Sequence, residues 1–92
     1  MSLAIHHHLE RSRFEYEHNG LLSFIDYQLN DNVMSIMHTY VPKALTGQGI
    51  AAALTRAALH CARNNQWQVR PICSYTATYL KRHLEFQDLI AH

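Results

Sequence analysis

The sequence predicts a single α/β or α+β domain in which a mostly antiparallel sheet is flanked by two helices. Two observations predict this class. Short segments with alternating apolar residues fill the first half, and an alanine-rich segment with a helical period begins at Ile50, before one more short strand and a second helix. With 92 residues the chain supports one modest core. We therefore expect one domain over residues 1–92, with residues 1–12 as a loose N-terminal segment or a short strand.

A hairpin opens the predicted sheet. Residues 13–17 (RFEYE) alternate between apolar and charged side chains, and residues 21–29 (LLSFIDYQL) form the next strand-like segment. Asn19-Gly20 lies between them, and this pair is typical of a tight two-residue turn. The polar residues 30–32 then mark a second turn.

The third predicted strand covers residues 33–41 (VMSIMHTYV) and stops at Pro42. Side chains in a strand alternate between its two faces. The period of two places the following residues on one face: Met34, Ile36, His38 and Tyr40.

The second half is predicted to be helix, strand, helix. The first helix ends at Asn64-Asn65, and QVRPIC (68–73) forms a short fourth strand. Ser74 is expected to cap the second helix. The expected apolar stripe of the first helix is Ile50, Ala53, Leu54, Ala57, Ala58 and Cys61, with Thr55 off it, and one side of the second helix carries Tyr75, Tyr79 and Arg82.

Composition narrows the class of protein. No apolar run approaches the ~18 residues that span a bilayer, and we expect a cytoplasmic, soluble monomer. The two cysteines are expected to be free thiols, and no metal site is expected. His6, His7 and His8 are interpreted as an exposed tail without an assigned role.

Residues 43–92 carry six basic residues against two acidic residues, which suits a phosphate-bearing ligand. The basic residues are too scattered to indicate nucleic-acid binding.

The segment KALTGQGIAAAL, residues 43–54, places Gly47 and Gly49 at the predicted helix start. Glycines there let a phosphate approach the free N–H groups of a helix N-terminus, whereas an isolated GxG more often marks a plain turn. The segment also fits GxGxxA, but the following strand has no acidic residue for a dinucleotide ribose. There is no GK[ST] ending for a nucleoside triphosphate either.

Four segments occur in a characteristic order: HTYVP (38–42), GQGIA (47–51), RPICSY (70–75) and the final YLKRHLEFQDLI. Together they resemble the GNAT acetyltransferase superfamily, in particular its small single-domain N-acetyltransferases, and the resemblance runs from Arg13 to Ile90. It implies a truncated GNAT acyl-CoA N-acyltransferase fold without the C-terminal strands of larger members. It also implies acetyl-CoA as cosubstrate and an amine acceptor, which could be as large as a lysine on a protein surface.

The resemblance also implies where coenzyme A lies. The GxG loop would wrap its pyrophosphate and the strand before the loop would pair with its pantetheine arm. Ala44 stands where the superfamily has Gln or Arg, so backbone N–H groups are expected to hold the pyrophosphate. The residues expected to bind the cofactor are Tyr40, Val41, Gly47, Gln48, Gly49, Ile50, Ala51, Ser74, Tyr75, Tyr79 and Arg82.

Two residues are candidates for the chemistry. His38 is the best general base by its ordinary pKa, although a packed core histidine is the alternative. Cys73 lies between a strand end and the first turn of a helix, a position that lowers the pKa of a thiol, and its alternative is a small buried hydrophobe. The resemblance implies that the acetyl group lies between these two residues. It also implies direct attack by the amine, which is favoured over an acetyl relay through Cys73.

Three classes of function remain open at this level. The first is an acetyl-CoA-dependent N-acetyltransferase. The second is a coenzyme A-binding module without efficient catalysis, and the third is an interaction domain without a ligand. The resemblance implies that the C-terminal strands which cover the substrate in larger members have no counterpart here, so no particular amine is predicted as the acceptor.

Overall fold

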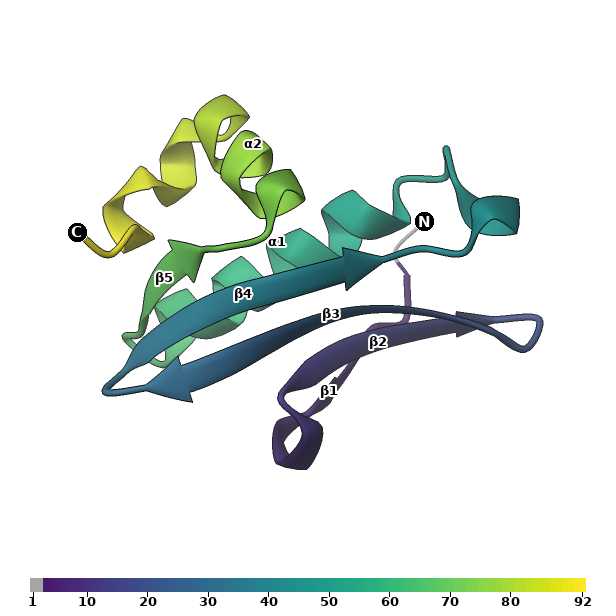
Figure 1. Ribbon diagram of the computed structural model, residues 1–92, viewed down its shortest axis with the longest axis horizontal. Coiled ribbons are helices and arrows are strands. Elements are labelled where there is room, and N and C mark those ends of the chain that lie inside the picture. The colour runs from purple at the N-terminus through teal and green to yellow at the C-terminus, as the bar shows by residue number, and fades with distance from the viewer. Residues whose placement is uncertain (1–2) are drawn as a thin grey trace.

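The computed structural model describes residues 3–92, and it contains a five-stranded sheet and two α-helices (Figure 1). The strands follow each other across the sheet in the order β1-β2-β3-β4-β5. Strands β1 to β4 are antiparallel, whereas β5 pairs with β4 in parallel. This architecture confirms the predicted fold class. The elements are β1 (His6–His8), β2 (Arg13–His18), β3 (Leu21–Asn30), β4 (Val33–Tyr40), α1 (Ile50–Asn64), β5 (Gln68–Pro71) and α2 (Ser74–Arg82), with short 3₁₀ helices at Leu9–Arg11, Lys43–Leu45 and Leu84–Leu89.

One core lies between the sheet and the helices. Helix α1 packs across β2, β3 and β4, and α2 contacts β4, β5 and α1, so both helices cover the same face (Figure 1). Neither α-helix covers the opposite face, and polar side chains such as Asp26 and His38 lie there. We call it the uncovered face. The core-forming side chains of the strands are Phe14, Ile25, Tyr27, Met34, Ile36 and Val69.

The predicted hairpin between β2 and β3 is confirmed. Asn19 has φ +51° and Gly20 has φ +79°. Two consecutive positive φ angles are what a tight hairpin turn requires, and Asn-Gly adopts them at low cost. The turn therefore follows from the sequence.

A β-bulge in β4 overturns the predicted faces of that strand. Tyr27 of β3 pairs with Ile36, but Asp26 pairs with His38, so Met37 is an extra residue in β4. An extra residue reverses the alternation of side chains beyond it. His38 consequently lies on the uncovered face, opposite Met34 and Ile36 in the core, and the expectation that these three share a face is wrong. The interpretation of His38 as a packed core residue is wrong for the same reason.

Helix α1 is also rotated from the predicted stripe. Thr55, expected away from the core, is fully buried, as are Leu59 and Ala62. Its hydroxyl donates a hydrogen bond to the carbonyl oxygen of Ala51 at 2.8 Å, which satisfies the polar group without an outside partner. Ala53 and Ala57 are only partly buried, because they lie at the edge of the interface.

The N-terminal histidines are not an exposed tail. His6–His8 form β1 and pair with β2. The ring of His7 stacks on Phe14 with 4.0 Å between ring centroids, and its Nε2 lies 2.6 Å from the Tyr27 hydroxyl. The segment therefore belongs to the sheet. Within residues 3–92, no helix is long and apolar enough to cross a membrane.

Candidate functional site

The loop before α1 leaves the N-terminus of this helix without a side-chain cap. Gly47 has φ +83° and Gly49, the N-cap residue, has φ +78°. The first backbone hydrogen bond of the helix runs from the N–H of Ala53 to the carbonyl oxygen of Gly49. Among residues 3–92, the N–H groups of Ile50, Ala51 and Ala52 have no hydrogen-bond acceptor. Such an end attracts anions through free N–H donors and the positive end of the helix dipole.

A cavity of about 240 Å³ lies directly at this helix end. It is bounded by the loop, by the first turn of α1, by Val41 after β4 and by Tyr75 of α2. A second cavity of about 150 Å³ adjoins it through Ala52 and Tyr75. Together the two cavities bring the following residues of the predicted cofactor set to one groove: Val41, Gly47, Gly49, Ile50, Ala51, Tyr75, Tyr79 and Arg82.

One edge of β4 is free just before Val41, the residue after the strand, which lines the groove. The parallel pairing of β4 with β5 ends at Ile36 and Pro71, and the chain then turns into α2. The N–H of Cys73 still donates to the carbonyl oxygen of Ile36 at 2.9 Å. Beyond this bond the two segments separate, so the edge of β4 after Met37 has no strand partner on the β5 side within the described residues. An extended ligand could pair with the backbone there.

Cys73 lies at the head of this gap. It is the N-cap residue of α2, which corrects the expectation that Ser74 caps the helix. Its Sγ lies 3.5 Å from Oγ1 of Thr39. Burial alone would raise the pKa of the Cys73 thiol, but the Thr39 hydroxyl and the N–H groups of Thr76 and Tyr75 outweigh it and lower the pKa. A thiolate is therefore stabilised at this helix N-terminus.

His38 lies on the other side of β4. Its Nδ1 is 3.1 Å from Oδ1 and 3.3 Å from Oδ2 of Asp26, which is its cross-strand neighbour on β3. The His38 side chain is 72% exposed, and Nε2 has no partner among residues 3–92. His38 and Cys73 are thus on opposite faces of the sheet, since Thr39, which contacts Cys73, pairs with the core residue Ile25.

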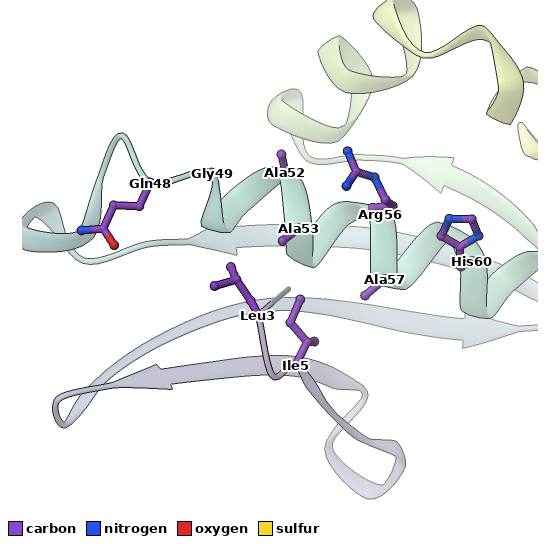
Figure 2. Close-up of a pocket in the computed structure, with 9 residues that line it drawn as sticks. All are labelled: Leu3, Ile5, Gln48, Gly49, Ala52, Ala53, Arg56, Ala57 and His60. Atoms are coloured by element: carbon purple, nitrogen blue, oxygen red, sulfur yellow. The ribbon is translucent and has the colours of Figure 1, made fainter. Parts of the chain in front are cut away.

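Three residues of the predicted cofactor set lie apart from the groove. Tyr40 is half exposed on the uncovered face, where its ring lies 5.6 Å from that of Phe24. Ser74 is exposed at the start of α2. Gln48 lines a separate cavity of about 540 Å³ on the outer side of α1, and Figure 2 shows its side chain pointing away from the helix.

That outer cavity is mostly apolar. In Figure 2, Leu3 and Ile5 of the N-terminal segment point toward α1, and Arg56 and His60 lie further along the helix. The GxG loop thus lies between two hollows. The two hollows share Gly49 and Ala52. Of the two, the hollow lined by Tyr75 also contains Ile50 and Ala51, whose N–H groups are free in the described part of the chain, and Val41 at the end of β4.

Sequence reasoning missed two residues of the site, Asp26 and Thr39. Both contact a predicted residue across strands, and those contacts depend on the bulge at Met37. A period-two pattern carries no signal for a bulge. The alternation around Asp26 could have shown only that its carboxylate faces away from the core.

The parallel strands β4 and β5 separate beside the uncapped N-terminus of α1. A sheet and helix in this arrangement define a small domain of the GNAT class. A model of the GCN5-related N-acetyltransferase family matches residues 13–89. The chain belongs to that family, whose members generally use acetyl-CoA as cosubstrate.

A solved structure supports the same assignment. The chain is similar to an NMR solution structure from Staphylococcus aureus, described as a "GCN5-like putative N-acetyltransferase". The two share 28% sequence identity with a TM-score of 0.76, and the match covers 98% of this chain and 89% of the other. The shared fold thus extends over nearly the whole of both chains.

Proposed function

We propose that the protein transfers an acetyl group from acetyl-CoA to an amine that attacks the thioester directly. The observation that carries this proposal is the uncapped start of α1, which faces the same groove as Val41 and Tyr75. Pyrophosphate at the N–H groups of Ile50 and Ala51 would leave the pantetheine arm along the free edge of β4. The thioester sulfur would then lie near Cys73.

Stabilisation of the leaving thiolate is supported by the lowered pKa of Cys73. The same N–H groups of Tyr75 and Thr76 that stabilise its thiolate would stabilise the thiolate of coenzyme A. In this proposal Cys73 lies beside the thioester sulfur, and the lowered pKa of its thiol indicates that this position favours a thiolate. Tyr79 is proposed to line the groove and not to donate a proton, because its ring stacks on His83 at 3.8 Å and its hydroxyl is buried.

His38 is proposed as the general base. Its exposed Nε2 would take a proton from the amine, whose nitrogen forms a bond to the acetyl carbon while the carbon–sulfur bond breaks. The uncovered face gives the amine an approach separate from the cofactor groove. Because His38 is 72% exposed, a large acceptor such as a lysine side chain of a protein can reach it.

Steady-state turnover tests the proposal. The protein is incubated with acetyl-CoA and a panel of small amines, polyamines and lysine-containing peptides, and the release of free coenzyme A thiol is measured. We expect turnover with at least one amine and a loss of roughly 10²–10⁴-fold in kcat for His38→Gln. His18→Gln, at the far hairpin end, is the matched control and should keep full activity.

Two results would count against the proposal. Binding of coenzyme A without turnover of any amine would favour a binding module. Equal activity losses in His38→Gln and His18→Gln would remove His38 from the chemistry.

A further inference from the structure

Nδ1 of His38 contacts the carboxylate of Asp26, which has no other partner among residues 3–92. Asp26 accepts a hydrogen bond from Nδ1 through either oxygen, at 3.1 and 3.3 Å. No other hydrogen bond or ion pair reaches the Asp26 side chain from residues 3–92. The bulge at Met37 creates this contact, since without it His38 would face the core while Asp26 stayed on the uncovered face.

A neighbouring arginine could have neutralised Asp26 but is occupied elsewhere. Arg13 is the cross-strand neighbour of Asp26 on β2. Its guanidinium instead lies 3.4 Å from the Glu15 carboxylate and 3.7 Å above the centre of the Phe24 ring. Glu15 is further engaged by His8 at 3.2 Å. This arrangement leaves the charge of Asp26 available to His38.

We propose that Asp26 is a positioning residue that fixes His38 in the tautomer with a proton on Nδ1 and a free lone pair on Nε2. A neutral imidazole carries its proton on either nitrogen, and a carboxylate at Nδ1 can accept only from an N–H there. The catalytic consequence rests on the proposed function. The tautomer itself does not.

The proton balance of the step is simple. The amine nitrogen gives its proton to Nε2, so the ring becomes an imidazolium that stays bonded to the Asp26 carboxylate through Nδ1. The hydrogen bond from Nδ1 to the Asp26 carboxylate then stabilises the added positive charge on the ring. The proton then leaves from Nε2 to solvent, because this nitrogen is exposed. Loss of Asp26 therefore affects both the fraction of rings with Nε2 free and the charge that develops on the ring.

Nuclear magnetic resonance tests the positioning without any substrate. Long-range ¹H–¹⁵N spectra of the full chain at pH 8.5 distinguish the two neutral tautomers of each histidine. We expect the Nδ1–H form for His38 in the wild type and a mixture of both tautomers in Asp26→Ala. Gln28→Ala, on the same face of β3 and two residues away, is the control and should leave the spectrum of His38 unchanged. An Nε2–H form in the wild type, or an unchanged ring in Asp26→Ala, would overturn the proposal.

A double-mutant cycle in kcat tests the catalytic consequence. We expect Asp26→Ala to lower kcat about tenfold, a part of the roughly 10²–10⁴-fold that a general base supplies, with little change in KM for acetyl-CoA. Asp26→Glu should recover part of this loss. In a His38→Ala background Asp26→Ala should cost nothing further, since its effect passes through His38. An equal loss in both backgrounds would show that Asp26 only stabilises the fold, whereas absence of wild-type turnover would refute the proposed function and leave the tautomer result standing.

Discussion

Oγ1 of Thr39 lies 3.5 Å from Sγ of Cys73, although the two residues are 34 positions apart in the chain. The contact joins the end of β4 to the start of α2, where the parallel strands separate. It requires the bulge at Met37, which turns Thr39 toward the helices and His38 away from them. The Cys73 thiol and the candidate base His38 therefore lie on opposite faces of the sheet.

The two cysteines should differ in reactivity. Burial raises the pKa of the Cys61 thiol, against a smaller opposing effect of Asn65, whereas the environment of Cys73 lowers its pKa. At pH 7.5 a larger fraction of Cys73 is therefore thiolate, and iodoacetamide should modify it first. The measurement is the rate of alkylation of each peptide by mass spectrometry, with the protein in guanidinium as control. Faster modification of Cys61 in the folded protein would contradict the described environment of Cys73.

Cys73→Ser separates direct attack from an acetyl relay. The substitution keeps the size and a hydroxyl but removes the ionisable sulfur. Because His38 lies on the opposite face from Cys73, we expect direct attack, so kcat should fall less than about tenfold. Incubation with acetyl-CoA alone should leave the Cys73 peptide unacetylated in mass spectrometry. A loss of several orders of magnitude, with an acetyl-Cys73 that passes to added amine at the turnover rate, would establish the relay instead.

The glycines of the loop should matter for coenzyme A affinity. A Cβ at Gly47 or Gly49 would meet no atom within 4 Å, so the strain of an alanine there comes from the positive φ alone. With alanine at either position, the loop would relax in the free protein. It would then have to return to a positive φ when coenzyme A binds. That costs about 1 kcal/mol, or about fivefold in Kd by calorimetry.

Gly20→Ala is the matched control for the loop glycines, because Gly20 has φ +79° but lies in the hairpin. It should lower the melting temperature and leave the Kd of the folded protein unchanged. Equal losses of affinity at all three glycines would remove the GxG loop from the binding site.

Acidification should destabilise the fold through His7. Burial lowers the pKa of His7 from its ordinary value of 6.5, and the neighbouring His8 lowers it further, against an opposing effect of Glu10. The neutral ring is thus favoured in the folded state. Its contribution to stability is present above pH 6.5 and is lost as the pH falls through the lowered pKa.

The melting temperature at pH 7.5 and at pH 5.5 measures this effect. His7→Gln should show a smaller drop between the two values than the wild type, because glutamine can still bond to Tyr27 but does not titrate. His6→Gln, the exposed neighbour on the same strand, should keep the wild-type drop. An equal drop in the wild type and in His7→Gln would contradict the role of His7.

Local patterns were sufficient to predict the order of the main elements, whereas the residues expected around the groove came from the resemblance to the GNAT superfamily. Local sequence determines the structure of three features: the Asn19-Gly20 turn, the alanine-rich helix and the GxG loop. Each depends mainly on interactions between residues that are close in the chain. The faces of β4 could not be predicted, because the bulge at Met37 arises from pairing with β3. The burial of Thr55 was also missed. Its hydroxyl donates to the carbonyl oxygen of Ala51 within the helix, and the apolar pattern does not show that bond.

The N-terminal histidines show the same limit. Three consecutive polar residues carry no alternation, and their pairing with β2 depends on contacts that only the fold provides. His7 packs because Phe14 and Tyr27 lie next to each other on the core face, and its ring nitrogen reaches the Tyr27 hydroxyl. A terminal histidine segment alone gives no indication of such a partner.

A titration of the ¹⁵N-labelled protein with coenzyme A, followed in ¹H–¹⁵N correlation spectra, tests the central claim most directly. If the cofactor lies in the groove between β4 and α2, the largest shifts should occur at the backbone amides of Val41, Gly49, Ile50, Ala51 and Tyr75. Added salt should weaken the response, because phosphate contacts are screened over a Debye length of about 8 Å at physiological ionic strength. No response at millimolar coenzyme A, or shifts confined to the outer cavity at Leu3, Ile5 and His60, would contradict the proposed site.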